Sequence, residues 1–274
     1  MTVLIHPDVS ANRSSRSPSP AIWDPNEWLG ILSGAIDGYC YHDDFIAFNG
    51  TVTTNVGTYS NGWYSFEDTG GSIANLTSEV GGVIRLATDN SDNDDVTLNL
   101  GGVVGANFKI ASSGGKKLCM EARVRLQEVA TRNFIFALGE EALAVTDGLV
   151  TDSDALTSKD FIGFHSLSGD ATAIDTFYRK AGQTAATVQD DVHTITADGW
   201  VKLGLVFDPS YRDVSKAIRY YVDGVEQTSG VARSVLDDAT FPDGEELVPY
   251  FNIKNGTTTI TRVDIDWFRI LQLA

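Results

Sequence analysis

The closing segment of the chain, Ile260–Leu273, constrains the fold more than any other part of the sequence. Apolar and polar side chains alternate along it, and this period of two predicts a β-strand with one face in a core and the other toward solvent. We expect the core side to carry Val263, Ile265, Trp267 and Leu271, and the solvent side to carry Arg262, Asp264 and Asp266.

Similar patterning runs through the chain from Tyr41 onward. In the segment 117–126, Glu121 and Arg123 alternate with apolar neighbours and are expected to face solvent. In the segment 133–138, the residues that follow Asn133 are continuously apolar, which is typical of a central strand covered on both faces. Asp223-Gly224 and Asn255-Gly256 suit tight hairpins because both residues accept a positive φ. The sequence therefore predicts an all-β protein built as a two-sheet antiparallel sandwich.

Composition narrows the classes of partner. The chain has 274 residues and a net charge of −17, and a field of this sign repels nucleic acid and anionic membranes. No apolar stretch is long enough to cross a membrane. The N-terminus lacks the basic and apolar regions of a signal peptide, so we expect assembly in a cytosol. Cys40 and Cys119 are expected to be free thiols.

Residues 1–40 differ in composition from residues 41–274, which we expect to form the folded domain. The stretch 11–20 is rich in Ser, Arg and Pro and cannot bury enough apolar area to fold alone. We predict an extended N-terminal arm that docks on a neighbouring subunit or a partner, with an arm laid across its own domain as the alternative. The candidate partner-binding residues are Arg13, Arg16, Ile22, Trp23, Trp28, Leu29, Ile31 and Leu32.

Few residues of the sequence form a catalytic or metal-binding pattern. Asp264 and Asp266 share a strand face but lack a third partner for glycan cleavage, and the four histidines form no hydrolase motif. The loop from Asp89 to Asp95 could offer oxygens to Ca²⁺, but a solvated acidic loop is the favoured interpretation. We therefore predict no catalytic residue, no enzymatic activity, no cofactor and no metal site.

The segment from Tyr41 to Ala274 resembles the concanavalin A-like lectin/glucanase jelly roll in its laminin-G-like form. The resemblance implies a two-sheet jelly roll, a fold that carries lectins, glycanases and structural modules alike. The catalytic motif of the glycanases has no counterpart in this sequence, so the functions that the resemblance implies are binding or assembly. The matching segments are Asp43–Phe45, Glu121–Leu126, Asp160–Phe164, Asp198–Leu205, Ile218–Gly224 and Val263–Ile270.

Chains of this composition are also similar to virion proteins of tailed phages. That similarity implies a non-enzymatic protein that decorates or cements a capsid as a homo-oligomer, with a trimer favoured. Its partner would be the major capsid protein or another virion protein, with no direct contact to nucleic acid or membrane, and it would reside in the virion after assembly in the host cytoplasm. The alternative is a carbohydrate-binding module of a phage tail or receptor-binding protein, in which Trp63, Tyr59 and Tyr64 would stack on sugar rings.

Overall fold

The computed structural model describes residues 16–79, 81–101, 108–127, 132–140, 149–170 and 172–274. They form two antiparallel sheets, one short α-helix and three 3-10 turns. The prediction of an all-β two-sheet sandwich is confirmed. The helix is α1 (Pro25–Leu32), and the 3-10 turns are η1 (Ser60–Gly62), η2 (Ser168–Asp170) and η3 (Arg233–Asp237).

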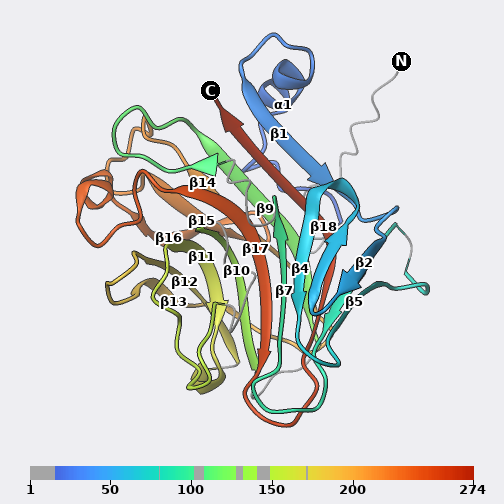
Figure 1. Cartoon of the computed structure of the whole chain (residues 1–274). Helices are drawn as coiled ribbons and strands as arrows, with labels where there is room; N and C mark the ends of the chain where they lie inside the picture. Colours follow the sequence, from blue (N-terminus) through green and yellow to red (C-terminus); the bar gives the residue numbers. More distant parts are fainter. Residues whose placement is uncertain (1–15, 80, 102–107, 128–131, 141–148, 171) are drawn as a thin grey trace.

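Sheet A has eight strands in the order β16-β15-β14-β9-β18-β6-β5, and β1 also pairs with β18. Figure 1 shows it behind the other sheet, with β1 and α1 at one end of the sandwich beside the C-terminus. Its strands are β1 (Gly38–Asp43), β5 (Ser72–Asn75), β6 (Ile84–Ala87), β9 (Leu118–Leu126), β14 (Trp200–Phe207), β15 (Ile218–Val222), β16 (Val225–Val231) and β18 (Arg262–Leu273).

Sheet B has ten strands in the order β13-β12-β11-β10-β17-β7-β4-β3-β2, and β8 also pairs with β17. These strands are β2 (Gly50–Thr53), β3 (Val56–Tyr59), β4 (Trp63–Glu67), β7 (Asp95–Leu100), β8 (Phe108–Lys109), β10 (Arg132–Glu140), β11 (Phe161–Ser166), β12 (Ala173–Arg179), β13 (Ala186–Thr194) and β17 (Glu246–Asn255). No helix in the described part of the chain is long and apolar enough to cross a membrane.

Aromatic side chains fill the space between the two sheets. Phe136 and Phe251 stack with their centroids 4.8 Å apart on sheet B, and the Trp63 ring meets Phe268 of sheet A edge-on at 5.6 Å. All four rings are fully buried, and edge-to-face or offset pairs of this kind contribute beyond the area that they bury. The sheets are therefore held together by interdigitated side chains, as in other sandwiches.

A β-bulge in β18 corrects the predicted face assignment of the closing strand. The register with β9 shifts between Ile265 and Trp267, and a bulge of one residue exchanges the two faces beyond it. Val263 and Ile265 face the core as predicted, but Trp267 and Leu271 lie outside the main core cluster, which Phe268 and Ile270 join instead.

The segment 16–24 lies on the outer face of sheet A, and we call it the docked segment. Ile22 is only 3% exposed. Its side chain packs with Cys119, Val206 and Tyr221, and Trp23 flanks this small cluster. The arm thus contacts its own sheet over this stretch, as the alternative interpretation of the sequence proposed.

Polar contacts fix the docked segment on the sheet. Glu121 accepts hydrogen bonds from the backbone N–H of Ser19 at 3.0 Å and from the Trp23 indole at 2.6 Å. The Trp267 indole donates to the carbonyl oxygen of Arg16 at 2.6 Å. Glu121 is fully buried, so the prediction that it faces solvent is wrong. The segment that covers it lies about a hundred residues away along the chain, beyond the reach of a local pattern.

Candidate functional site

A pocket of about 570 Å³ opens on the outer face of sheet B, over β11, β12 and β13. Three strands contribute lining side chains: His165 from β11, Arg179 from the end of β12 and Thr187 from β13. Two loops, 154–158 and 182–185, and Leu167 after β11 supply the remaining described lining. The lining residues are Asp154, Ala155, Leu156, Ser158, His165, Leu167, Arg179, Gly182, Gln183, Thr184, Ala185 and Thr187.

The walls of the pocket are fixed by contacts to the sheet below. Leu156 belongs to a second apolar cluster with Phe161 and Phe177, and its carbonyl oxygen accepts a hydrogen bond from Arg179 at 2.5 Å. Asp154 accepts hydrogen bonds from Asn133 at 2.7 Å and from the Ser168 hydroxyl. Because its loops are tied down in this way, the pocket exists before any ligand arrives.

The polar groups of the pocket differ in kind. Asp154 offers a carboxylate, Arg179 a guanidinium and Gln183 an amide, while Ser158 and Thr187 offer hydroxyls. Leu156 and Leu167 add apolar surface. The pocket thus presents both hydrogen-bond donors and acceptors beside a small apolar patch.

His165 lies under this pocket as an unpaired neutral base. Burial lowers its pKa to about 4, so the imidazole is uncharged near neutral pH. Its ring packs 4.7 Å from the Phe177 ring, and its Nδ1 has no hydrogen-bond partner in the described structure. A buried polar atom without a partner costs free energy, which marks the position as one where a ligand or ion would be stabilising.

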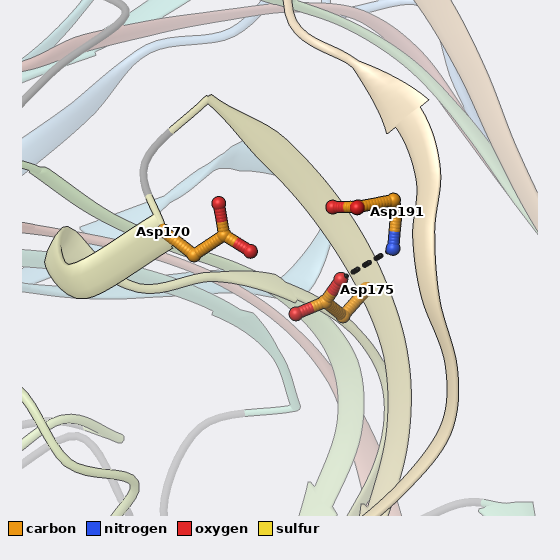
Figure 2. A group of neighbouring side chains, drawn as sticks. All are labelled: Asp170, Asp175 and Asp191. Atoms are coloured by element: carbon orange, nitrogen blue, oxygen red, sulfur yellow. Dashed lines mark hydrogen bonds between the residues drawn. The ribbon is translucent and has the colours of Figure 1, made fainter.

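Three aspartates meet on this face of the protein, as Figure 2 shows, and one of them, Asp175, lies 3.9 Å from the His165 Nδ1. Asp170 ends η2, Asp175 lies on β12 opposite His165, and Asp191 lies on β13. Their carboxylate oxygens lie within 4.8 Å of one another, and Asp175 accepts a hydrogen bond from the Asp191 backbone N–H at 2.8 Å. Burial raises the pKa of Asp175, and the charges of Asp170, Asp190 and Asp191 raise it further.

A buried polar network occupies the same face of sheet B on β7 and β17. Asp95 accepts hydrogen bonds from Asn252 at 2.7 Å and from Thr97 at 3.0 Å, and Lys254 donates to Asp152 at 2.6 Å. Asp95 is only 2% exposed. The interpretation of residues 89–95 as a solvated loop is therefore wrong at Asp95, whose carboxylate is bonded inside the protein.

The buried carboxyl of Asp95 should make stability depend on pH. Burial raises its pKa to about 7, above the unfolded value of about 3.9. Between these two pKa values the folded protein binds more protons than the unfolded chain does. The contribution of Asp95 to the free energy of unfolding therefore falls as the pH rises from the lower pKa to the higher one, and it stays constant at higher pH. We expect Asp95→Asn to remove this contribution, measured as the difference from the parent protein in urea titrations at about pH 5 and about pH 8.

The matched control for Asp95 is Asp92→Asn, because Asp92 is exposed in the same loop. It should keep the pH dependence of the parent protein. An identical pH dependence in the parent and in Asp95→Asn would show that Asp95 is ionised throughout the window.

None of the candidate partner-binding residues in the described part of the chain lines this pocket. Arg13 lies outside the described residues. Arg16 pairs with Asp266 of its own chain at 2.6 Å, and Ile22 and Trp23 contact sheet A. Trp28 and Ile31 are partly buried, whereas Leu29 and Leu32 on α1 are 62% and 65% exposed. Within the described arm, the large apolar side chains that remain exposed are Leu29 and Leu32 on α1, together with Ile36 and Tyr39.

The aromatic groove predicted at Trp63 and Tyr59 is not present. Both side chains are buried, and they bond inward: the Trp63 indole donates to Asp43 at 2.9 Å, and the Tyr59 hydroxyl donates to Glu67 at 2.5 Å. The alternating sequence pattern predicted that these rings lie on strands, but it could not show that both rings are buried in the core.

Comparison with known proteins identifies the fold through solved structures. No family model matches the chain, and no curated protein matches it, but 261 chains of solved structures do. A protein of unknown function from Shewanella oneidensis has a TM-score of 0.55 at 13% identity, covering 94% of this chain and 97% of that one. Peanut lectin has a TM-score of 0.54 at 11% identity, covering 86% and 97%.

The same comparison corrects the prediction that the chain is not an enzyme. A glycoside hydrolase family 16 protein from Bacteroides ovatus, solved with its glucan product, has a TM-score of 0.50 at 12% identity and covers 84% of this chain and 99% of its own. This architecture is thus used by glycan-cleaving enzymes as well as by lectins, and an absent sequence motif does not separate the two classes. The protein has the jelly-roll fold of the concanavalin A-like lectins and glucanases.

Proposed function

We propose that the protein binds glycans in the pocket on the outer face of β11, β12 and β13. The observation that carries the proposal is the convergence of Asp154, Arg179 and Gln183 around one pre-formed cavity. The structural neighbours support it, since they include carbohydrate-binding and glycosidase jelly-roll proteins.

The groups of the pocket suit the hydroxyls of a sugar. Each hydroxyl both donates and accepts hydrogen bonds, and adjacent hydroxyls match planar bidentate groups such as a carboxylate, a guanidinium or an amide. Leu156 and Leu167 lie where the C–H face of a ring could cover apolar surface.

Blocking the pocket tests the proposal. Thr187 is exposed on β13 and lines the cavity, so Thr187→Trp should fill it without disturbing the core. We expect the glycans that the parent protein binds on a broad array to bind this variant about tenfold more weakly or worse, a loss of about 1.4 kcal/mol, when the hits are measured by calorimetry.

The control for this test is Thr194→Trp, which adds the same ring at an exposed position of the same strand outside the pocket. It should bind as the parent protein does. Bound glycans are also analysed by chromatography for cleavage. Failure of the parent protein to bind any glycan, or equal binding by Thr187→Trp, would refute the proposal.

A second candidate function rests on α1. No residue of this helix is buried, and Leu29 and Leu32 are exposed. The helix lies at one end of the sandwich (Figure 1). Such a surface would serve attachment to the major capsid protein or another virion protein, with the protein located in the virion as a trimer. Sedimentation with phage shells would test it, and a Leu29→Ser, Leu32→Ser variant should then fail to co-sediment.

A further inference from the structure

Arg179 lines the pocket on β11, β12 and β13 as a cation for which the described chain supplies no counter-ion. Its Nη1 donates a hydrogen bond to the Leu156 carbonyl oxygen, and its buried Nε has no hydrogen-bond partner in the described structure. Burial lowers the pKa of the guanidinium, and no carboxylate of the described residues opposes this shift. The charge is therefore partly desolvated without being neutralised.

Other arginines of the chain show what a partly buried guanidinium requires. Arg85 donates from Nε at 2.7 Å and from Nη2 at 3.0 Å to the two oxygens of Asp264. Arg123 pairs with Asp266 at 2.6 Å. Removing a charge from water costs free energy unless a counter-ion or hydrogen bonds replace the water. A ligand anion at Arg179 would supply the compensation that these two aspartates supply elsewhere.

The other polar groups of the pocket leave Arg179 available to a ligand. Asp154 is the one acid among the described lining residues, and its carboxylate accepts hydrogen bonds from Asn133 and Ser168. The remaining polar side chains of the lining are the neutral imidazole of His165 and hydroxyl and amide groups. An anion that enters the pocket thus meets one positive charge, and the single acid is already hydrogen-bonded.

The group of three aspartates on this face is too distant to neutralise Arg179. Asp175 precedes Arg179 by four residues on β12, which is about 13 Å along a strand. Charges that face solvent are largely screened beyond about 8 Å at physiological ionic strength. The same screening limits the repulsion that the net charge of −17 exerts on an anionic ligand. A direct contact with Arg179 therefore outweighs the distant acids.

We propose that the pocket takes acidic glycans, whose sugar rings carry a carboxylate or a sulfate, and that Arg179 pairs with this anionic group. The inference rests on the proposed glycan binding and names the class of glycan. A guanidinium presents its N–H groups in a planar fork that matches the two oxygens of a carboxylate, and it also pairs with tetrahedral anions. The hydroxyls of the same sugar are left to the neutral groups of the lining.

The test compares matched glycans on the full chain. An array of uronic acid oligomers, sulfated oligosaccharides and their neutral counterparts is probed with the parent protein, and the hits are measured by calorimetry. We expect acidic glycans to bind at least about tenfold more tightly than the neutral ones. Methyl esterification of a bound uronate should weaken its binding by about tenfold or more, because it removes the charge and keeps the ring hydroxyls. Binding of the uronates alone would identify the carboxylate as the recognised group, and binding of the sulfated glycans alone would identify the sulfate.

Arg179→Met tests the residue itself, since it removes the charge and keeps a long side chain. We expect it to weaken the binding of acidic glycans by about tenfold or more. Arg179→Lys keeps the charge but loses the fork, so it should recover part of the affinity. The control is Arg212→Met, which removes the same charge at an exposed position outside the pocket and should bind within about twofold of the parent protein.

Two results would overturn this inference and leave glycan binding itself standing. One is neutral glycans that bind the parent protein as tightly as acidic ones do. The other is an equal loss of affinity in Arg179→Met and Arg212→Met. Absence of any bound glycan would instead refute the proposed function, and this inference with it.

Discussion

Replacing Asp264 by alanine is expected to lower the free energy of unfolding by about 3–5 kcal/mol, because it removes a fully buried carboxylate that pairs with two partly buried guanidinium groups. Asp264 is fully buried on β18. Arg85 approaches it at 2.7 Å from β6, and Arg125 approaches it at 2.7 Å from β9. The carboxylate also accepts a hydrogen bond from Gln127 at 3.1 Å. One side chain thus joins three neighbouring parts of sheet A.

Urea titration of the purified variant measures this loss. The control is Asp237→Ala, an exposed aspartate that should change the free energy of unfolding by no more than about 0.5 kcal/mol. A loss below about 1 kcal/mol in Asp264→Ala would mean that the ion pairs behave as solvated surface pairs, which is how the sequence pattern presented this residue.

The difference between pattern and structure at Asp264 has a physical cause. Alternation correctly placed Asp264 on the face opposite Val263 and Ile265, and that face does point away from the core. The pattern could not show that arginines from β6 and β9 would lie over it, or that the docked segment would cover the neighbouring Glu121. Long-range covering of a sheet face leaves no local period.

Local signals were sufficient elsewhere. The continuous apolar run at 134–138 lies in β10, whose side chains enter the main core at Phe134 and Phe136 and a second cluster at Ile135 and Ala137. Asp223-Gly224 became the two-residue turn between β15 and β16, with φ of 50° and 78°. Asn255-Gly256 did not form a tight hairpin, because Asn255 ends β17 and its amide bonds to Asp89 and Ser91 instead.

The candidate site was beyond the reach of the sequence for a different reason. Asp170, Asp175 and Asp191 have no regular spacing, and they meet because β11, β12 and β13 pair in order. The His165–Asp175 pair follows from the register of β11 with β12, and a bulged register between β12 and β13 places the third acid. Predicting the group would have required strand pairing, which a single sequence does not supply.

The second large expected effect is a loss of stability when the docked segment is changed. Ile22→Ala should lower the free energy of unfolding by about 2 kcal/mol or more, since it opens a cavity between Cys119, Val206 and Tyr221. Leu29→Ala is the matched control on α1, where the side chain is exposed, and it should change stability by no more than about 0.5 kcal/mol.

Protein concentration then decides between an arm held on its own domain and an arm exchanged with a neighbour. A contact within one chain is independent of concentration, whereas an exchanged arm makes the unfolding midpoint rise with concentration by mass action. We expect the midpoints of the parent protein and of Ile22→Ala to stay constant over a hundredfold range of concentration, on the order of 1–100 µM. A midpoint that rises with concentration in the parent protein, and that rises less in Ile22→Ala, would show that Ile22 docks on a neighbouring subunit.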